Sequence, residues 1–121
     1  MSYEEHLKCQ QIVIDKACEV AKQYTDVVGI YLSGSHALND NTPYSDVDLE
    51  ILFDSDTRDS RKKIHEDLIS IFPTLSNLYL YDKDGLFLYE NGVRLDVAYI
   101  KPTDFQSSCC MVSRYYMTRR I

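Results

Sequence analysis

Residues 33–50 read SGSHALNDNTPYSDVDLE, a Gly-Ser turn followed by a polar loop and a short row of acids. The segment before them, residues 27–32, is short and nearly all apolar, which is typical of strands covered on both faces or nearly so. Residues 39–43 are dense in turn-forming side chains. Residues 46–53 predict a second strand. The stretch therefore predicts two strands joined by a polar loop.

Two further segments have the apolar spacing of amphipathic helices. Residues 4–24 repeat apolar side chains at steps of three and four, with Ser2 as the helix cap. We assign this helix no chemistry and expect it to cover one face of a sheet. Residues 59–72 predict a second helix, capped by Asp59 or Ser60.

The second half of the chain adds strands. Three are predicted, at residues 77–81, 86–90 and 93–100, and the last two are joined by Asn91-Gly92, a strong hairpin signal. A last helix is predicted from about residue 105 to the end. The order of elements predicts an α+β (α/β-like) domain, with a mixed β-sheet of about five strands backed by helices.

The bulk composition restricts the class of protein. A chain of 121 residues forms one domain, residues 1–121. Its net charge of −6 makes nucleic-acid binding unlikely, since little counterion release is available. No apolar run approaches the roughly 18 residues of a membrane span, and the N-terminus does not resemble a signal peptide. The four cysteines form no Cys-x-x-Cys pair, which suits a reducing compartment, so we expect a cytoplasmic protein.

Acidic side chains converge on one face of the predicted sheet. Asp46, Asp48 and Glu50 share a face of their strand, and two carboxylates about 6.5 Å apart along a strand can bind one or two divalent ions. Asp96 is the natural third ligand for a two-metal site of phosphoryl transfer. It lies within an apolar strand, where an acid costs stability unless a metal ion or a cation such as Arg94 pairs with it.

The Gly-Ser turn supplies a candidate phosphate site. Gly34 tolerates the backbone angles of a tight turn, exposed N–H groups there favour anions, and the Ser35 hydroxyl can donate to a phosphate oxygen. Each feature alone has an ordinary alternative: a simple turn for Gly34-Ser35, and a surface or salt-bridged acid for Asp96. Their combined order favours a site for a phosphate chain and its metal ions.

This pattern resembles the nucleotidyltransferases of the DNA polymerase beta superfamily. Their signature of Gly-Ser, a gap of about ten residues, Asp-x-Asp and a later acid is matched by residues 33–35, 44–49 and 95–97. The sequence of residues 43–46, Pro-Tyr-Ser-Asp, resembles that of the kanamycin-type nucleotidyltransferases. The small size resembles the minimal nucleotidyltransferases, which include antitoxins paired with HEPN-domain toxins.

The resemblance implies a role for each matching residue. Gly34 and Ser35 would bind the triphosphate of ATP or another nucleoside triphosphate. Asp46 and Asp48 would ligate two Mg²⁺ ions, with Asp96 as a third ligand or as the base. The implied reaction moves a nucleoside monophosphate, AMP in the first instance, to an acceptor hydroxyl and releases pyrophosphate.

Two functions remain open on this reading. One is an enzyme that modifies a small molecule or a protein. The alternative is an antitoxin that binds or nucleotidylates a HEPN toxin partner. Larger relatives carry a C-terminal helical acceptor domain that 121 residues leave no room for, so the acceptor site would lie across a homodimer, on a partner, or outside this chain. A domain that only binds nucleotide is disfavoured, because Asp46, Asp48 and Asp96 repel one another and have no structural use.

Overall fold

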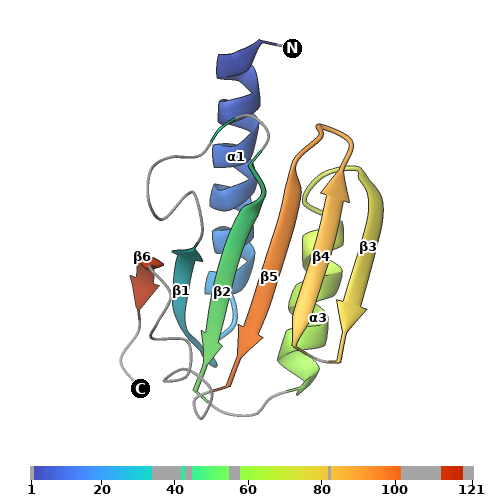
Figure 1. Ribbon diagram of the computed structural model, residues 1–121. Helices are drawn as coiled ribbons and strands as arrows, with labels where there is room; N and C mark the ends of the chain where they lie inside the picture. The colour runs from blue at the N-terminus through green and yellow to red at the C-terminus, as the bar shows by residue number, and fades with distance from the viewer. Residues whose placement is uncertain are drawn as a thin grey trace.

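The computed structural model describes residues 2–33, 42, 45–54, 58–81 and 83–101, and the backbone of 113–118. Figure 1 shows the helices of the described residues behind a twisted sheet. In the described part of the chain the sheet has six strands in the order β3-β4-β5-β2-β1-β6. The strands are β1 (Val27–Ser33), β2 (Val47–Phe53), β3 (Thr74–Leu80), β4 (Asp84–Tyr89), β5 (Arg94–Ile100) and β6 (Ser113–Thr118).

The sheet is mixed, as the sequence predicts. Its two central strands, β2 and β5, run parallel, and every other neighbouring pair is antiparallel. The Asn91-Gly92 hairpin is confirmed between β4 and β5, with the Val93 N–H donating to Asn91 Oδ1 at 3.0 Å and Gly92 at a φ of 88°. The α+β class with a helix-backed mixed sheet is therefore confirmed.

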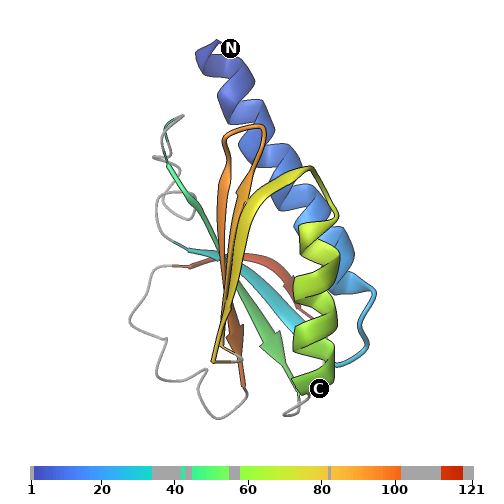
Figure 2. The same cartoon turned by 90° about the vertical axis from the view of Figure 1, so that its right-hand side faces the viewer.

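Both described helices cover the same face of the sheet, as the side view in Figure 2 shows. Helix α1 (Tyr3–Lys22) is capped as predicted, since the Ser2 side chain accepts from the Glu5 N–H at 3.2 Å. Helix α3 (Arg58–Ile69) begins one residue before Asp59. The prediction that Asp59 or Ser60 caps this helix was wrong. Asp59 lies in the first turn instead, where its charge favours the helix dipole.

One apolar core fills the space between the helices and the sheet. Side chains alternate along β2 and β5, so every second residue of each strand points into this core. The members of the core from these strands and from α1 are Val47, Leu49, Ile51, Phe53, Leu95, Val97, Tyr99, Val13, Ile14, Ala17, Cys18 and Ala21, all at most 3% exposed. Among the described residues neither helix is long and apolar enough to cross a membrane.

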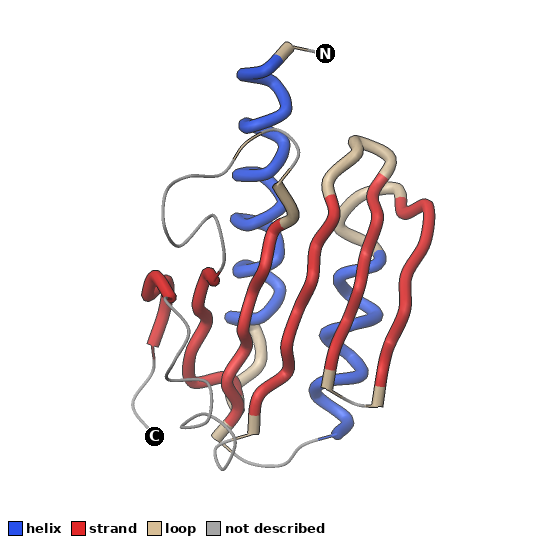
Figure 3. The backbone as a smooth tube through the Cα atoms, in the orientation of Figure 1, coloured by secondary structure: helices blue, strands red, loops and turns tan. Residues whose placement is uncertain are grey.

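The predicted C-terminal helix was wrong for residues 113–118. They form strand β6, which pairs antiparallel with β1 (Figure 3). Two tyrosines and a threonine favour an extended backbone there. The pairing also satisfies the backbone groups on the outer edge of β1, which would otherwise be open. Residues 105–112 and 119–121, which the prediction also assigned to that helix, lie outside the described residues.

Candidate active site

The parallel pairing of β2 and β5 sets two of the predicted acids side by side. Asp48 is the direct register partner of Asp96. Both lie on the face of the sheet opposite the helices, because their neighbours Val47, Leu49 and Leu95 point into the core. The two carboxyl groups lie near enough for each to shift the pKa of the other. Residues 48 and 96, far apart in sequence, therefore form one acidic pair at the centre of the sheet.

Partial burial and like charge make this pair reluctant to ionise. Burial raises the pKa of Asp48 to about 6, and the negative charges of Asp96 and Asp46 add to the rise. Burial also raises the pKa of Asp96, as does the charge of Asp46, while the nearby Arg94 guanidinium acts in the opposite direction. A cation beside the pair would relieve both effects.

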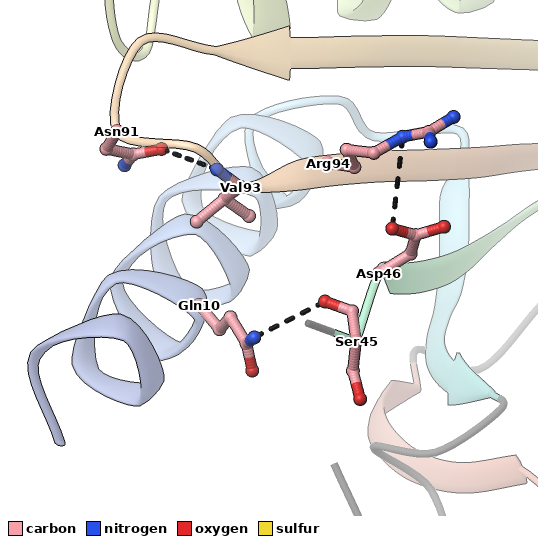
Figure 4. Close-up of polar contacts among 6 residues, drawn as sticks. All are labelled: Gln10, Ser45, Asp46, Asn91, Val93 and Arg94. Atoms are coloured by element: carbon pink, nitrogen blue, oxygen red, sulfur yellow. Dashed lines mark hydrogen bonds and ion pairs between the residues drawn. The ribbon is translucent and has the colours of Figure 1, made fainter. Parts of the chain in front are cut away.

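Asp46 lies immediately before β2, near enough for its charge to raise the pKa of Asp48 and of Asp96. Its Oδ1 forms an ion pair with Arg94 Nε at 3.9 Å (Figure 4). The sequence suggested Arg94 as a partner for Asp96; its ion pair is with Asp46, while its charge also lowers the pKa of Asp96. The side chains of Arg94 and Asp46 are 62% and 40% exposed, so solvent weakens this pair. Asp46 is therefore accessible to a ligand that could replace the guanidinium.

Gln10 of α1 holds the loop that leads into Asp46. Its Nε2 donates to the carbonyl oxygens of Thr42 at 2.8 Å and Ser45 at 3.3 Å (Figure 4 draws the contact with Ser45). The sequence reading assigned α1 no chemistry and missed this contact. A signal was present, because Gln10 interrupts the apolar stripe between Leu7 and Ile14. A buried polar residue at such a position needs a partner.

A cleft of about 560 Å³ opens over the acidic pair. Its polar lining includes Asp48, Asp96, Glu50, Asp84 and Ser33, the residue before Gly34 in the sequence. Its apolar lining includes Leu80, Leu86, Ala98 and Ile100. A second hollow of about 180 Å³ shares Asp96 and Leu86 with the cleft and extends over β3 and β4. The acids thus border space for a ligand with both polar and apolar parts.

The acids suit Mg²⁺ chemically, although no complete centre is preformed. Carboxylate oxygens are the ligands that Mg²⁺ prefers, and burial together with the charges of Asp96 and Asp46 raises the pKa of Asp48, an effect that a cation would oppose. Within the described residues, however, no three His, Cys, Asp or Glu side chains lie close enough together to hold a metal ion. Asp48 and Asp96 are brought together and Asp46 lies beside them. Gly34 and Ser35 lie outside the described residues, so their role in nucleotide binding stays a prediction.

Solved structures with this fold include nucleotidyltransferases. A crystal structure of a candidate nucleotidyltransferase from Sulfolobus solfataricus matches with a TM-score of 0.58 at 15% identity, covering 96% of this chain and 86% of that one. The STING-associated CdnE c-di-GMP synthase from Capnocytophaga granulosa matches with a TM-score of 0.58 at 17% identity. The RNA terminal uridylyl transferase Cid1 matches with a TM-score of 0.60 at 19% identity.

The last two matches concern part of larger proteins. They cover 81% and 82% of this chain but only 34% of the CdnE chain and 31% of the Cid1 chain. At these identities the likeness establishes the fold alone. A search of curated protein sequences finds no significant match.

The family model of the nucleotidyltransferase domain matches residues 14–112. This range holds most of the chain, including Asp46, Asp48 and Asp96, and the resemblance seen in the sequence is confirmed at this level. The chain belongs to the nucleotidyltransferase domain family.

Proposed function

We propose that this protein is a Mg²⁺-dependent nucleotidyltransferase that transfers a nucleoside monophosphate, AMP in the first instance, from a nucleoside triphosphate to an acceptor hydroxyl. The observation that carries the proposal is the pairing of Asp48 with Asp96 across β2 and β5, with Asp46 beside them. Like charges gathered beside an open cleft are costly unless they bind a cation. Because the chain belongs to the nucleotidyltransferase family, we infer that the cation would bind together with a nucleoside triphosphate.

The reaction requires positioning and charge neutralisation more than covalent chemistry. The acceptor oxygen attacks the α-phosphorus in line, a new P–O bond forms, and the bond to the bridging oxygen breaks. The electron pair of that bond leaves with pyrophosphate. Asp46 and Asp48 would hold Mg²⁺, which neutralises phosphate charge when bound. Asp96 would complete the ligand set or accept the proton of the acceptor hydroxyl.

The acceptor is either a small molecule or a protein. The cleft and the second hollow meet at Asp96, so the triphosphate and the acceptor could approach the acids from two sides. We propose that further parts of the acceptor site lie outside the described residues, on another segment, a second copy or a partner. A protein acceptor would favour the antitoxin alternative.

The proposal is tested with α-labelled nucleoside triphosphates, the purified chain and cell lysate, with Mg²⁺ or with a chelator. We expect Mg²⁺-dependent transfer of label and release of unlabelled pyrophosphate. A parallel reaction with Asp96→Asn controls for other enzymes in the lysate. Label on a small molecule supports metabolite modification, and label on a protein supports modification of a partner. Absence of transfer from all four common ribonucleoside triphosphates would contradict the proposal.

A further inference from the structure

Gln10 is a buried polar residue of α1 that has no part in the proposed reaction. It is a polar side chain on the apolar side of α1, and it is only 2% exposed. Its neighbours along that side, Val13 and Ile14, belong to the apolar core. A buried amide at such a place costs stability unless its donors find acceptors. Two acceptors of its side-chain amide lie before β2, at Thr42 and Ser45.

Thr42 and Ser45 are hydrogen-bonded to each other before β2. The Ser45 N–H donates to the Thr42 carbonyl at 3.0 Å, and the Thr42 N–H donates to Ser45 Oγ at 2.8 Å. Gln10 Nε2 then donates to the carbonyl oxygens of both residues, at 2.8 Å and 3.3 Å. One amide group therefore joins both Thr42 and Ser45 to α1, which is itself packed in the core.

The contact with Ser45 reaches the acidic site directly. The carbonyl of Ser45 belongs to the same planar peptide group as the N–H of Asp46, so fixing that oxygen restricts the direction from which Asp46 enters β2. Gln10, Ser45 and Asp46 also line one hollow of about 240 Å³, together with Arg94. The hydrogen bonds between strands do not restrain Asp46 in this way, because β2 begins at Val47, after Asp46.

We propose that Gln10 is a positioning residue that holds the carboxylate of Asp46 beside Asp48 and Asp96 for binding a divalent cation. The inference rests on the proposed function in assigning a cation to Asp46. Without this restraint Asp46 would move away from Asp48 and Asp96, and the cation would have two acidic ligands in place of three. The expected consequence is weaker cation binding by a chain that remains folded.

The test measures binding of Mn²⁺ alone, by electron paramagnetic resonance of the free ion, with no nucleotide or acceptor. Gln10→Met keeps the length of the side chain and its preference for helix but removes both hydrogen bonds. Gln11→Met is the matched control, because Gln11 is the exposed neighbour whose amide bonds to Asp15 within α1. We expect the Kd for Mn²⁺ to rise at least fivefold in Gln10→Met and to stay within twofold in Gln11→Met.

A purely structural role predicts a different pattern. Gln10→Met would then lower the thermal midpoint while leaving the Mn²⁺ affinity of the folded chain unchanged, and that result would overturn the inference. If Gln10→Met does not fold, Gln10→Glu replaces it: the acid has at most one donor for the two carbonyls, and we expect at least a twofold rise in Kd. An unchanged affinity in Gln10→Glu also overturns the inference.

The experiment separates this inference from the proposed function. Wild-type protein that binds Mn²⁺ but transfers no nucleotide would contradict the proposed reaction and leave Gln10 supported by its own variants. Wild-type protein that transfers nucleotide, with Gln10→Met matching its Mn²⁺ affinity, would overturn only the role of Gln10. A wild-type chain that binds no Mn²⁺ would overturn the positioning role, since there is then no cation site to position.

Discussion

The two faces of the sheet use the same strands for opposite purposes. On the helix side of β2, Val47, Leu49 and Ile51 are at most 1% exposed and pack into one continuous core. On the open side of the same strand, Asp48 lies beside Asp96 under a cleft. Burial of apolar surface stabilises the first face, whereas like charges held together destabilise the second. The comparison suggests that the helix-covered face supplies the stability that allows acids to gather on the other.

The largest expected effect is on catalysis at the open face. Asp48→Asn keeps the size of the side chain but removes the charge that a cation requires. Because metal ions contribute several kcal/mol to transition-state stabilisation, we expect nucleotidyl transfer to fall about 10²-fold or more. The thermal midpoint should be unchanged or raised, since a repelling charge is lost. Pyrophosphate release and a melting curve on the same sample measure both.

Full activity in Asp48→Asn would show that the acids are not the metal ligands. A parallel loss of activity and of folding would show instead that the open face contributes to the stability of the domain. Only loss of activity with retained stability agrees with the division between the two faces.

The second effect is the loss of stability on the helix side. Ile51 is fully buried in β2, so Ile51→Ala should lower the free energy of unfolding by about 3 kcal/mol through lost burial and a cavity. Leu88 lies in β4, where its side chain points to the open face of the sheet and is only half-buried. Leu88→Ala should therefore cost about 1 kcal/mol. Urea unfolding of both variants checks the difference, and equal losses would contradict the comparison.

A third test concerns crowding on the helix side. A Cβ at Gly85 would lie 2.7 Å from Tyr99 Oη and 2.9 Å from His65 Nδ1. Such overpacking of a dense core should lower the free energy of unfolding by about 2 kcal/mol in Gly85→Ala. Removing the nearest atom with Tyr99→Phe should recover part of this loss. Gly92→Ala is the control, because nothing lies within 4 Å of its Cβ and only its positive φ is strained; Tyr99→Phe should not rescue it.

The sequence predicted the faces of the sheet well because side chains alternate along a strand. Asp48 and Asp96 each interrupt an apolar alternation, so their common direction could be inferred before their contact was known. Their exact opposition could not, because the register of two strands distant in sequence is set by packing of the whole sheet.

Other features depended on tertiary contacts that local patterns do not carry. Strand β6 was predicted as helix because its pairing partner, β1, lies at the other end of the chain. The contact of Gln10 with Ser45 joins α1 to a loop with no periodic signal. The pairing of Arg94 with Asp46 rather than Asp96 depends on how the chain enters β2. Long-range geometry, and not residue type, decided these cases.

The smallest expected effect is on the pH dependence of stability. The pKa of Asp48 is about 6 in the folded protein, above the roughly 3.9 of an unfolded aspartate. Between these values the folded chain binds more protons than the unfolded chain, so this group's stabilisation is complete below about pH 4 and is lost as pH rises through about 6. Because the side chain is partly exposed, we expect a loss of only about 1 kcal/mol.

Asp48→Asn isolates this contribution, because asparagine does not titrate. The difference in free energy of unfolding between the variant and the wild type should be near zero at pH 4 and should grow to about 1 kcal/mol in favour of the variant by pH 7. Urea unfolding at several pH values measures it. A difference that does not change with pH would mean that Asp48 ionises without penalty. Ionisation on the open face would then not lower the free energy of unfolding, and the apolar core on the helix-covered face would not be needed to compensate for it.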